Sequence, residues 1–269
     1  MQTVLLPSGA RIAYTDQGSQ PKIPVLLVHG HPFDRSMWSP QAEYAARNGH
    51  RVVVPDLRGY GESTGPEVSG LDSFAEDLIG LADHLGLSRF VLGGLSMGGQ
   101  IVMQTVRDHP ERIAALLLAD TFAEPETAEG KTARNAAADR VLAEGMAGYA
   151  DELLPKMVSP ATLRENPEVT AHVRKMMHDA PAAGAAAALR ARANRPDYRD
   201  SLQQVSVPTL VVVGSEDEFT PVADAQLLHQ LVPGSELAVL DGAGHLPNLE
   251  RVAEFNDVFG RFLDHAEER

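Results

Sequence analysis

The chain has 269 residues, a length that suits one large α/β domain or a core domain with an insertion. Hydrophobic residues make up 43% of it and charged residues 22%, a balance that excludes a disordered or collagen-like protein. Lys and Arg number 23 against 37 Asp and Glu, so the net charge is −14, which argues against nucleic acid or an anionic membrane as the main partner. The absence of cysteine excludes disulfides, thiolate metal sites and a cysteine nucleophile.

The N-terminal segment reads as two strands rather than as a targeting signal. Residues 1–9 predict a strand and a Ser-Gly turn, and residues 11–16 predict a second strand. The segment has no basic region followed by a long apolar core, and no stretch of the chain reaches the roughly 18 apolar residues of a membrane span. We therefore expect no membrane partner and a location in the cytoplasm.

Short apolar runs that end at Gly, Pro or Asp recur along the chain. The runs that predict strands are residues 24–29, 51–54, 90–94, 114–119, 209–213 and 236–240. Because they are apolar throughout rather than alternating, we expect strands buried on both faces, as in a parallel sheet covered by helices.

Helical patterns lie between these runs. Residues 73–85 open on an S-x-x-E capping box at Ser73 and Glu76, and residues 97–108 follow a glycine-rich turn. Residues 251–263 carry apolar side chains at helical spacing. Strands that alternate with helices predict a mainly parallel α/β sheet.

Residues 121–200 depart from this alternation of strands and helices. The segment contains no good strand candidate, is rich in alanine, and is nearly balanced in charge, with 11 Lys and Arg against 12 Asp and Glu. We expect a core formed by residues 1–120 and 201–269 and a helical cap over residues 121–200. Because ligands in α/β sheets bind outside the carboxyl ends of the strands, where this insertion begins, the cap is expected to act as a lid.

A G-x-S-x-G sequence, Gly94-Leu95-Ser96-Met97-Gly98, connects a predicted strand to a predicted helix. In this context the pattern is typical of a nucleophile elbow, a sharp turn that exposes the serine hydroxyl at the edge of the sheet. The N–H groups of the following helix favour an oxyanion. The run lacks the G-K-[ST] of a phosphate loop and the G-x-G-x-x-G spacing of a dinucleotide site.

A serine nucleophile needs a base and a group that holds the base. Asp217 lies just after the strand predicted at 209–213, and His245 lies just after the strand at 236–240. The chain order Ser, Asp, His is typical of α/β hydrolases, and we expect Ser96, Asp217 and His245 to form a catalytic triad. Asp120, at the end of another predicted strand, is the alternative acid.

Two further motifs complete a resemblance. Residues 28–33 read VHGHPF and residues 56–63 read DLRGYGES. Together with the elbow and the Asp and His turns, they make the chain resemble serine hydrolases of the α/β-hydrolase fold, and in particular carboxylesterases and 3-oxoadipate enol-lactonases. The resemblance implies a mostly parallel eight-stranded sheet flanked by helices, with a helical cap between strands 6 and 7. It also implies that the backbone N–H groups of His31 and Met97 form the oxyanion hole.

The predicted activity is the cofactor-free hydrolysis of a carboxylic ester or lactone through an acyl-enzyme on Ser96. One alternative is a perhydrolase or haloperoxidase, in which peroxide reacts at the same triad. Another is a small-molecule receptor of the same fold that hydrolyses slowly or not at all. The substrate is expected to be a small apolar ester or lactone, and the sequence is compatible with a homo-oligomer.

The H-x-H pair of His29 and His31 does not predict a metal site, because the further ligands that zinc requires are missing nearby. We therefore expect no metal and no cofactor. An apolar pocket is expected to form a wall that binds the acyl group of the substrate. The candidate residues for this wall are Phe33, Trp38, Phe122, Met176, Met177 and Leu246.

Overall fold

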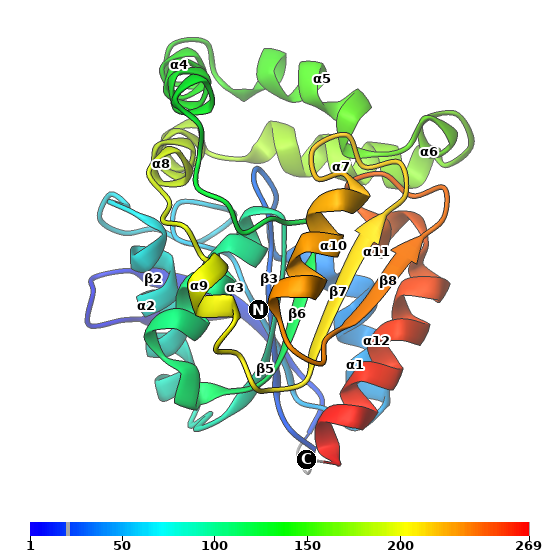
Figure 1. Cartoon of the computed structure of the whole chain (residues 1–269). Coiled ribbons are helices and arrows are strands. Elements are labelled where there is room, and N and C mark those ends of the chain that lie inside the picture. The colour runs from blue at the N-terminus through cyan, green and yellow to red at the C-terminus, as the bar shows by residue number, and fades with distance from the viewer. Residues whose placement is uncertain (20–21, 269) are drawn as a thin grey trace.

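The computed structural model describes residues 1–19 and 22–268 and contains an eight-stranded sheet between two layers of helices (Figure 1). The strands are β1 (Gln2–Leu5), β2 (Arg11–Gln17), β3 (Val25–Val28), β4 (Val52–Pro55), β5 (Phe90–Leu95), β6 (Ile113–Ala119), β7 (Thr209–Gly214) and β8 (Glu236–Leu240). Their order in the sheet is β1-β2-β4-β3-β5-β6-β7-β8. Strand β2 runs antiparallel to β1 and β4, and the other pairs are parallel, which confirms the predicted fold class.

The sheet divides the apolar core in two. On one face it packs against α2 (Leu71–His84), α3 (Met97–Asp108) and α10 (Val222–Leu231). On the other face it packs against α1 (Ser39–Arg47) and α12 (Val252–Glu267). Four short helices complete the core region: the 3₁₀ turns η1 (Arg35–Trp38) and η2 (Pro110–Arg112), and α9 (Arg199–Leu202) and α11 (Pro247–Glu250). Burial of this apolar surface is the main force that holds the layers together.

The strands predicted from apolar runs are confirmed to within one or two residues, but the expected burial is wrong for β8. Strand β8 lies at the edge of the sheet, where only β7 pairs with it. Glu236 is exposed and Val239 keeps 44% of its surface exposed. The run at 236–240 is therefore apolar without being buried on both faces.

The predicted capping box at the start of α2 is also wrong. The helix begins at Leu71, with Gly70 in the N-cap position, so Ser73 lies inside its first turn. The Ser73 hydroxyl pairs with the Ser69 hydroxyl at 3.1 Å instead of capping a backbone N–H. Leu71 is buried in the core, and this packing places the helix start two residues earlier than the polar signal.

Six helices lie between β6 and β7, and the first five of them lie above the carboxyl ends of the strands (Figure 1). These five are α4 (Ala128–Glu144), α5 (Met146–Met157), α6 (Pro160–Glu165), α7 (Pro167–Asp179) and α8 (Ala182–Ala193). Helix α4 packs against α8, and α5 packs against α7. The expected core range includes Gln20, Pro21 and Arg269, which lie outside the described residues.

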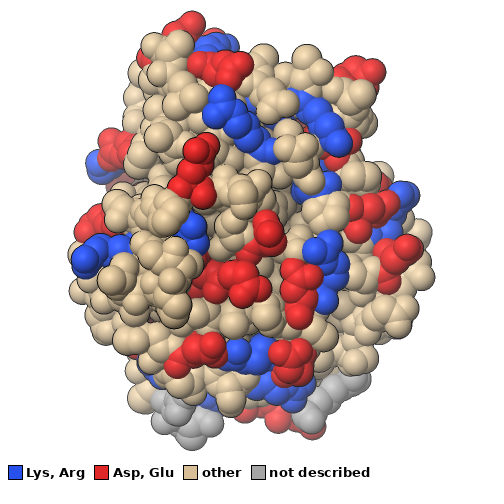
Figure 2. All heavy atoms as spheres, turned by 90° about the vertical axis from the view of Figure 1, so that its left-hand side faces the viewer, with Lys and Arg blue, Asp and Glu red and all other residues tan. Residues whose placement is uncertain are grey.

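The surface reflects the composition of the chain. On the face shown in Figure 2, acidic and basic side chains are interspersed over both the cap and the core. In the part of the chain that the structure describes, no helix combines the length and the apolar character needed to cross a membrane.

The cap touches the core closely where two glycines meet. A Cβ added to Gly184 of α8 would lie 1.8 Å from the carbonyl oxygen of Gly59, in the loop after β4. A contact that short is impossible, so Gly184→Ala should force the two backbones apart. We expect this variant to lower the free energy of unfolding by about 1–3 kcal/mol in urea titrations.

Gly148 of α5 is the matched control, since a Cβ added there meets nothing within 4 Å. Gly148→Ala should raise the free energy of unfolding by up to about 1 kcal/mol, because alanine favours the helix. Equal stability changes in both variants would contradict the close contact between α8 and the loop.

Candidate active site

Ser96 lies in the sharp turn between β5 and α3. Its φ of 57° and ψ of −117° fall outside the regions that non-glycine residues usually adopt. The backbone around it is held by three hydrogen bonds. The Ser96 N–H donates to the carbonyl of Ala119 at 2.9 Å, and the Ser96 carbonyl accepts from the N–H of Gln100 at 3.1 Å and from the Thr121 hydroxyl at 2.8 Å. The turn is therefore fixed in the geometry expected of a nucleophile elbow.

Small residues make this turn possible. A Cβ on Gly98 would lie 2.2 Å from the carbonyl oxygen of Val28, and one on Gly94 would lie 2.4 Å from the backbone of Gly98. Gly30 packs on the other side, where an added Cβ would come within 3.3 Å of the Ser96 Cβ. The loop after β3 thus lies directly against Ser96.

Asp217 and His245 form a direct pair. The Nδ1 atom of His245 lies 2.7 Å from Oδ2 of Asp217, and both side chains are buried. Asp217 also accepts hydrogen bonds from the N–H groups of Phe219 and Thr220, at 2.8 and 3.2 Å, and from the Thr220 hydroxyl. The contact with Asp217 orients the ring and leaves Nε2 of His245 free to face a substrate.

The pKa of Asp217 reflects this environment. Burial alone would raise it, but the charge and hydrogen bond of His245 lower it, and the donors from Thr220 and Phe219 add to the effect. The charged form of Asp217 is therefore favoured, and it can stabilise a positive charge on the neighbouring imidazole ring.

Asp120, the alternative acid, lies beside this pair in a different state. Its Oδ1 accepts from the N–H of Gly214 at 2.9 Å, and its buried Oδ2 has no hydrogen-bond partner among the described residues. Burial, followed by the charge of Asp217, raises the pKa of Asp120 well above its usual value. Because burial disfavours the charged form of Asp120, the electrostatics favour Asp217 as the group that stabilises a charged imidazole.

Ligating atoms of Asp120, Asp217 and His245 all lie within 4.8 Å of one another. This set suits a metal ion poorly, because Asp217 and His245 already bind each other and burial disfavours the charged form of Asp120 that a metal would need.

The two histidines of the H-x-H pair both use their rings in hydrogen bonds. In His29, Nδ1 donates to the carbonyl of Gly30 at 2.8 Å and Nε2 accepts from the N–H of Leu57 at 3.0 Å. In His31, Nδ1 lies 2.7 Å from the Tyr60 hydroxyl and Nε2 lies 3.0 Å from the Tyr149 hydroxyl. Neither ring has a nitrogen to spare for a metal.

The expected oxyanion donors come from two elements that meet at Ser96. His31 is in the loop after β3, and Met97 is the first residue of α3. The first N–H groups of a helix have no partner within it, so the Met97 N–H is available to a ligand. The Ser96 hydroxyl forms no hydrogen bond with another described residue, and only 6% of Ser96 is exposed. A hydrogen bond between a nucleophile and its base is often long or poorly aligned without substrate and tightens when substrate binds.

The six residues predicted to form the apolar wall do not all lie together in the structure. Five of the six belong to one buried apolar cluster, which contains Phe33, Trp38, Met176, Met177 and Leu246. Within it, Trp38 packs against Phe255 with ring centroids 5.9 Å apart, as a core residue does. Phe122 lies elsewhere, with the guanidinium of Arg195 4.5 Å above its ring.

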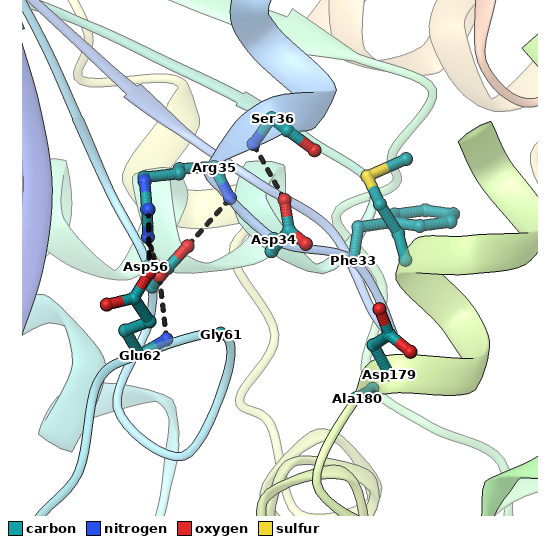
Figure 3. A pocket seen from close by; sticks show the side chains of 10 residues that line it. Phe33, Asp34, Arg35, Ser36, Asp56, Gly61, Glu62, Asp179 and Ala180 are labelled. Atoms are coloured by element: carbon teal, nitrogen blue, oxygen red, sulfur yellow. Dashed lines mark hydrogen bonds and ion pairs between the residues drawn. The ribbon is translucent and has the colours of Figure 1, made fainter. Parts of the chain in front are cut away.

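Phe33 and Met176 also line a cavity of about 300 Å³ between the loop after β3 and the end of α7 (Figure 3). Its other wall is polar. Arg35 binds Asp56 and lies 3.2 Å from Glu62, and Asp34 accepts from the N–H of Ser36 at 2.8 Å. The residues of this cavity therefore combine one apolar side with a dense network of ion pairs.

Several residues that position the predicted triad or the side chain of His31 were not predicted from the sequence. Thr220 holds Asp217, the ring of Phe219 lies 5.2 Å from that of His245, and Tyr60 and Tyr149 hold the side chain of His31. The nearness of Phe219 and Thr220 to Asp217 in the sequence is a weak signal for two of them. The two tyrosines are far from His31 in the chain, so no local pattern indicates them.

Glu250 is a further missed residue, and it connects the cap to the histidine loop. One side-chain oxygen accepts from the N–H of Ser159 and from the Thr162 hydroxyl, both at 2.7 Å. The other accepts from the N–H of Gly244 at 2.9 Å, next to His245. The side chain is buried, so these bonds are shielded from water.

Glu250→Gln should weaken this connection, because an amide NH₂ cannot accept from the donors that surround it. We expect the free energy of unfolding to fall by about 1.5–3 kcal/mol, the usual contribution of hydrogen bonds to a charged group. Urea titration measures this loss. Glu254→Gln, at an exposed position of α12, is the control and should change stability by less than about 0.5 kcal/mol. Equal stability of the Glu250 variant and the wild type would contradict the role of Glu250.

Known proteins match the chain over nearly its whole length. The family model for the alpha/beta hydrolase fold matches residues 23–252. The 3-oxoadipate enol-lactonase 1 of Acinetobacter baylyi is 31% identical over 230 residues, which cover 86% of this chain and 84% of that enzyme.

Two solved structures are also similar. A thermophilic esterase from Thermogutta terrifontis, with malate bound, has a TM-score of 0.96 and 39% identity and covers 99% of this chain and 100% of its own. The enol-lactonase from Burkholderia xenovorans has a TM-score of 0.89 and 28% identity and covers 98% of this chain and 100% of its own.

Proposed function

This chain belongs to the alpha/beta-hydrolase fold family, and from that premise we propose that it cleaves a carboxylic ester or lactone through an acyl-enzyme on Ser96. Hydrolysis of esters or lactones is the activity that its enol-lactonase and esterase relatives share. The observation that supports the serine mechanism is the buried 2.7 Å contact between His245 and Asp217, on the sheet edge where Ser96 occupies a strained turn.

In this mechanism the Ser96 hydroxyl attacks the carbonyl carbon while Nε2 of His245 accepts its proton. Asp217 holds Nδ1 of the ring and stabilises the imidazolium that forms. His245 then gives the proton to the leaving oxygen, which departs from the tetrahedral intermediate. Water then attacks the acyl-enzyme while His245 accepts a proton from the water. His245 gives this proton to Ser96 as the carboxylic acid leaves.

The negative charge on the tetrahedral intermediate needs donors that are already in place. We assign this role to the backbone N–H groups of His31 and Met97, which approach Ser96 from the loop after β3 and from the start of α3. Each donor of this kind contributes roughly 3–4 kcal/mol to the stability of the transition state. His31 is well placed for it, because its side chain is fixed between two tyrosine hydroxyls.

We also propose that the inserted helices over residues 121–200 act as a lid that contacts the acyl or alcohol group. Met176 and Met177, buried among the apolar residues that include Phe33 and Leu246, support this assignment. A lid of this kind selects substrates by fit, since one methylene in an apolar pocket changes binding by about 1–3 kcal/mol.

Replacement of the nucleophile tests the proposal directly. Ser96→Ala should leave the fold intact and lower kcat on phenyl acetate by about 10⁵–10⁶, because the triad acts as a unit. The measurement is initial-rate kinetics on purified protein, with circular dichroism as the check on folding. A well-folded variant with near-wild-type turnover would refute the assignment of Ser96.

The two candidate acids can be separated by comparing matched substitutions. Asp217→Asn should lower kcat by about 10⁴, because the amide cannot hold the ring in the required tautomer. Asp120→Asn should cost far less, since burial already disfavours the charged form of this carboxyl and raises its pKa. If Asp120→Asn were the more damaging change, the acid would have to be reassigned to the end of β6.

A further inference from the structure

Arg192 is a buried cation at the inner face of the cap. It lies near the end of α8, and only 8% of its surface is exposed. Its Nε donates to Oε1 of Gln100 in α3 at 3.2 Å, so the side chain crosses from the cap to the core. Gln100 lies one turn of helix after Ser96, and its N–H donates to the Ser96 carbonyl.

The positive charge of Arg192 has no carboxylate partner. Among the described residues, no Asp or Glu oxygen lies within 4.0 Å of its guanidinium, and Gln100 provides its one hydrogen bond. The nearest arginines already share one acid, since Arg134 and Arg195 both bind Glu126. The cluster thus holds three cations and one anion, in a chain whose net charge is −14.

The pKa values of Arg192 and Glu126 reflect this excess of positive charge. Burial, and after it the charges of Arg134 and Arg195, lowers the pKa of Arg192 to about 9. For Glu126, burial alone would raise the pKa, but hydrogen bonds from Arg195 and Arg134 lower it to about 2. Glu126 is therefore fully ionised and fully used by the other two arginines. A buried cation without a counter-charge is costly, and a bound anion would remove that cost.

A second polar group beside Arg192 also lacks a partner. The Nε2 atom of Gln100 is buried and makes no hydrogen bond within the described residues, although buried amide groups normally do. The charge of Arg192 also reaches the groups around the expected oxyanion hole: burial first, and then Arg192, lowers the pKa of His31. An arginine without a counter-charge and an amide nitrogen without a partner therefore lie together where α8 contacts α3, one helical turn after Ser96.

We propose that Arg192 and Gln100 form a subsite for a carboxylate of the substrate, so that the protein prefers esters or lactones that carry a negative charge. This inference rests on the proposed function and narrows its substrate class. A guanidinium binds a carboxylate with two parallel N–H···O bonds, and the Gln100 NH₂ adds a third donor. The uncharged part of the substrate contacts the apolar side of the lid.

Matched pairs of esters test the subsite. One pair is methyl hydrogen glutarate and methyl 5-methylhexanoate, in which an isopropyl group replaces the carboxylate on the acyl side. The other is 4-acetoxybenzoate and 4-isopropylphenyl acetate, which differ in the same way on the alcohol side. The measured quantity is the ratio of kcat/KM for the charged ester to kcat/KM for the neutral one.

In at least one pair, Arg192→Gln should lower this ratio by tenfold or more relative to the wild type, since hydrogen bonds to a charged group are strong. Arg192→Lys should keep part of the preference, because it retains the charge but not the paired donors. Arg190→Gln, two residues away on the same helix and bound to Asp139 at the surface, is the control and should leave both ratios within twofold. Ratios that stay within twofold in Arg192→Gln for both pairs would overturn the proposal.

A binding measurement keeps the test independent of turnover and of how the variants fold. Wild-type protein should bind glutarate at least tenfold more tightly than uncharged glutaramide in isothermal titration calorimetry. Equal affinities would refute the subsite even if the protein hydrolyses every ester. If the protein hydrolyses none of the four esters but prefers glutarate, the proposed function fails and the subsite stands.

Discussion

The rest of the site depends on the close packing of backbone where β5 enters α3. There is no room for a Cβ at Gly94 or Gly98, because the start of α3 presses against the carbonyl of Val28 in β3. Beside this contact Ser96 has a φ of 57°, a conformation that costs on the order of 1–3 kcal/mol. Hydrogen bonds at both peptide groups of Ser96 offset the strain. The hydroxyl is therefore positioned by the sheet itself rather than by a flexible loop.

Strand order then brings the remaining groups to the same edge. Strands β5, β6, β7 and β8 are neighbours and parallel, so Ser96, Asp120, Asp217 and His245 follow their carboxyl ends in sequence. Adjacent strands lie roughly 4.8 Å apart, which sets the spacing between the chains that carry these groups. Burial between the strands raises the pKa of Asp120, whereas the charge of His245 and the hydrogen bonds to Asp217 lower the pKa of Asp217. The pKa values of two aspartates in almost the same place thus shift in opposite directions.

Most of the fold could be predicted from the sequence because buried parallel strands are apolar throughout and end at Gly, Pro or Asp. The helix predicted at 97–108 is confirmed as α3. Predictions failed where packing outweighed a local signal: burial of Leu71 sets the start of α2, and the edge position of β8 exposes Val239. The groups expected in the triad are the ones that follow a strand end, which a sequence marks clearly.

The groups that link the cap to the core could not be predicted, because each acts across a long separation in the chain. Glu250 binds Ser159 and Thr162, and Arg192 reaches Gln100, with no local pattern at either end. In the sequence Arg192 is one polar residue in an alanine-rich helix, which suggests a solvated face. The small side chains of α8 instead let the helix approach the core closely, with Gly184 against Gly59.

That close approach has an electrostatic consequence. It removes water from Arg192, so the charge lies in a medium where an unpaired ion is far more costly than at the surface. The cap could reduce this cost with a nearby acid, as it does for Arg134 and Arg195 through Glu126. Among the described residues no acid does so for Arg192, so under the proposed subsite a bound carboxylate would stabilise the contact between α8 and α3 as well as bind the substrate.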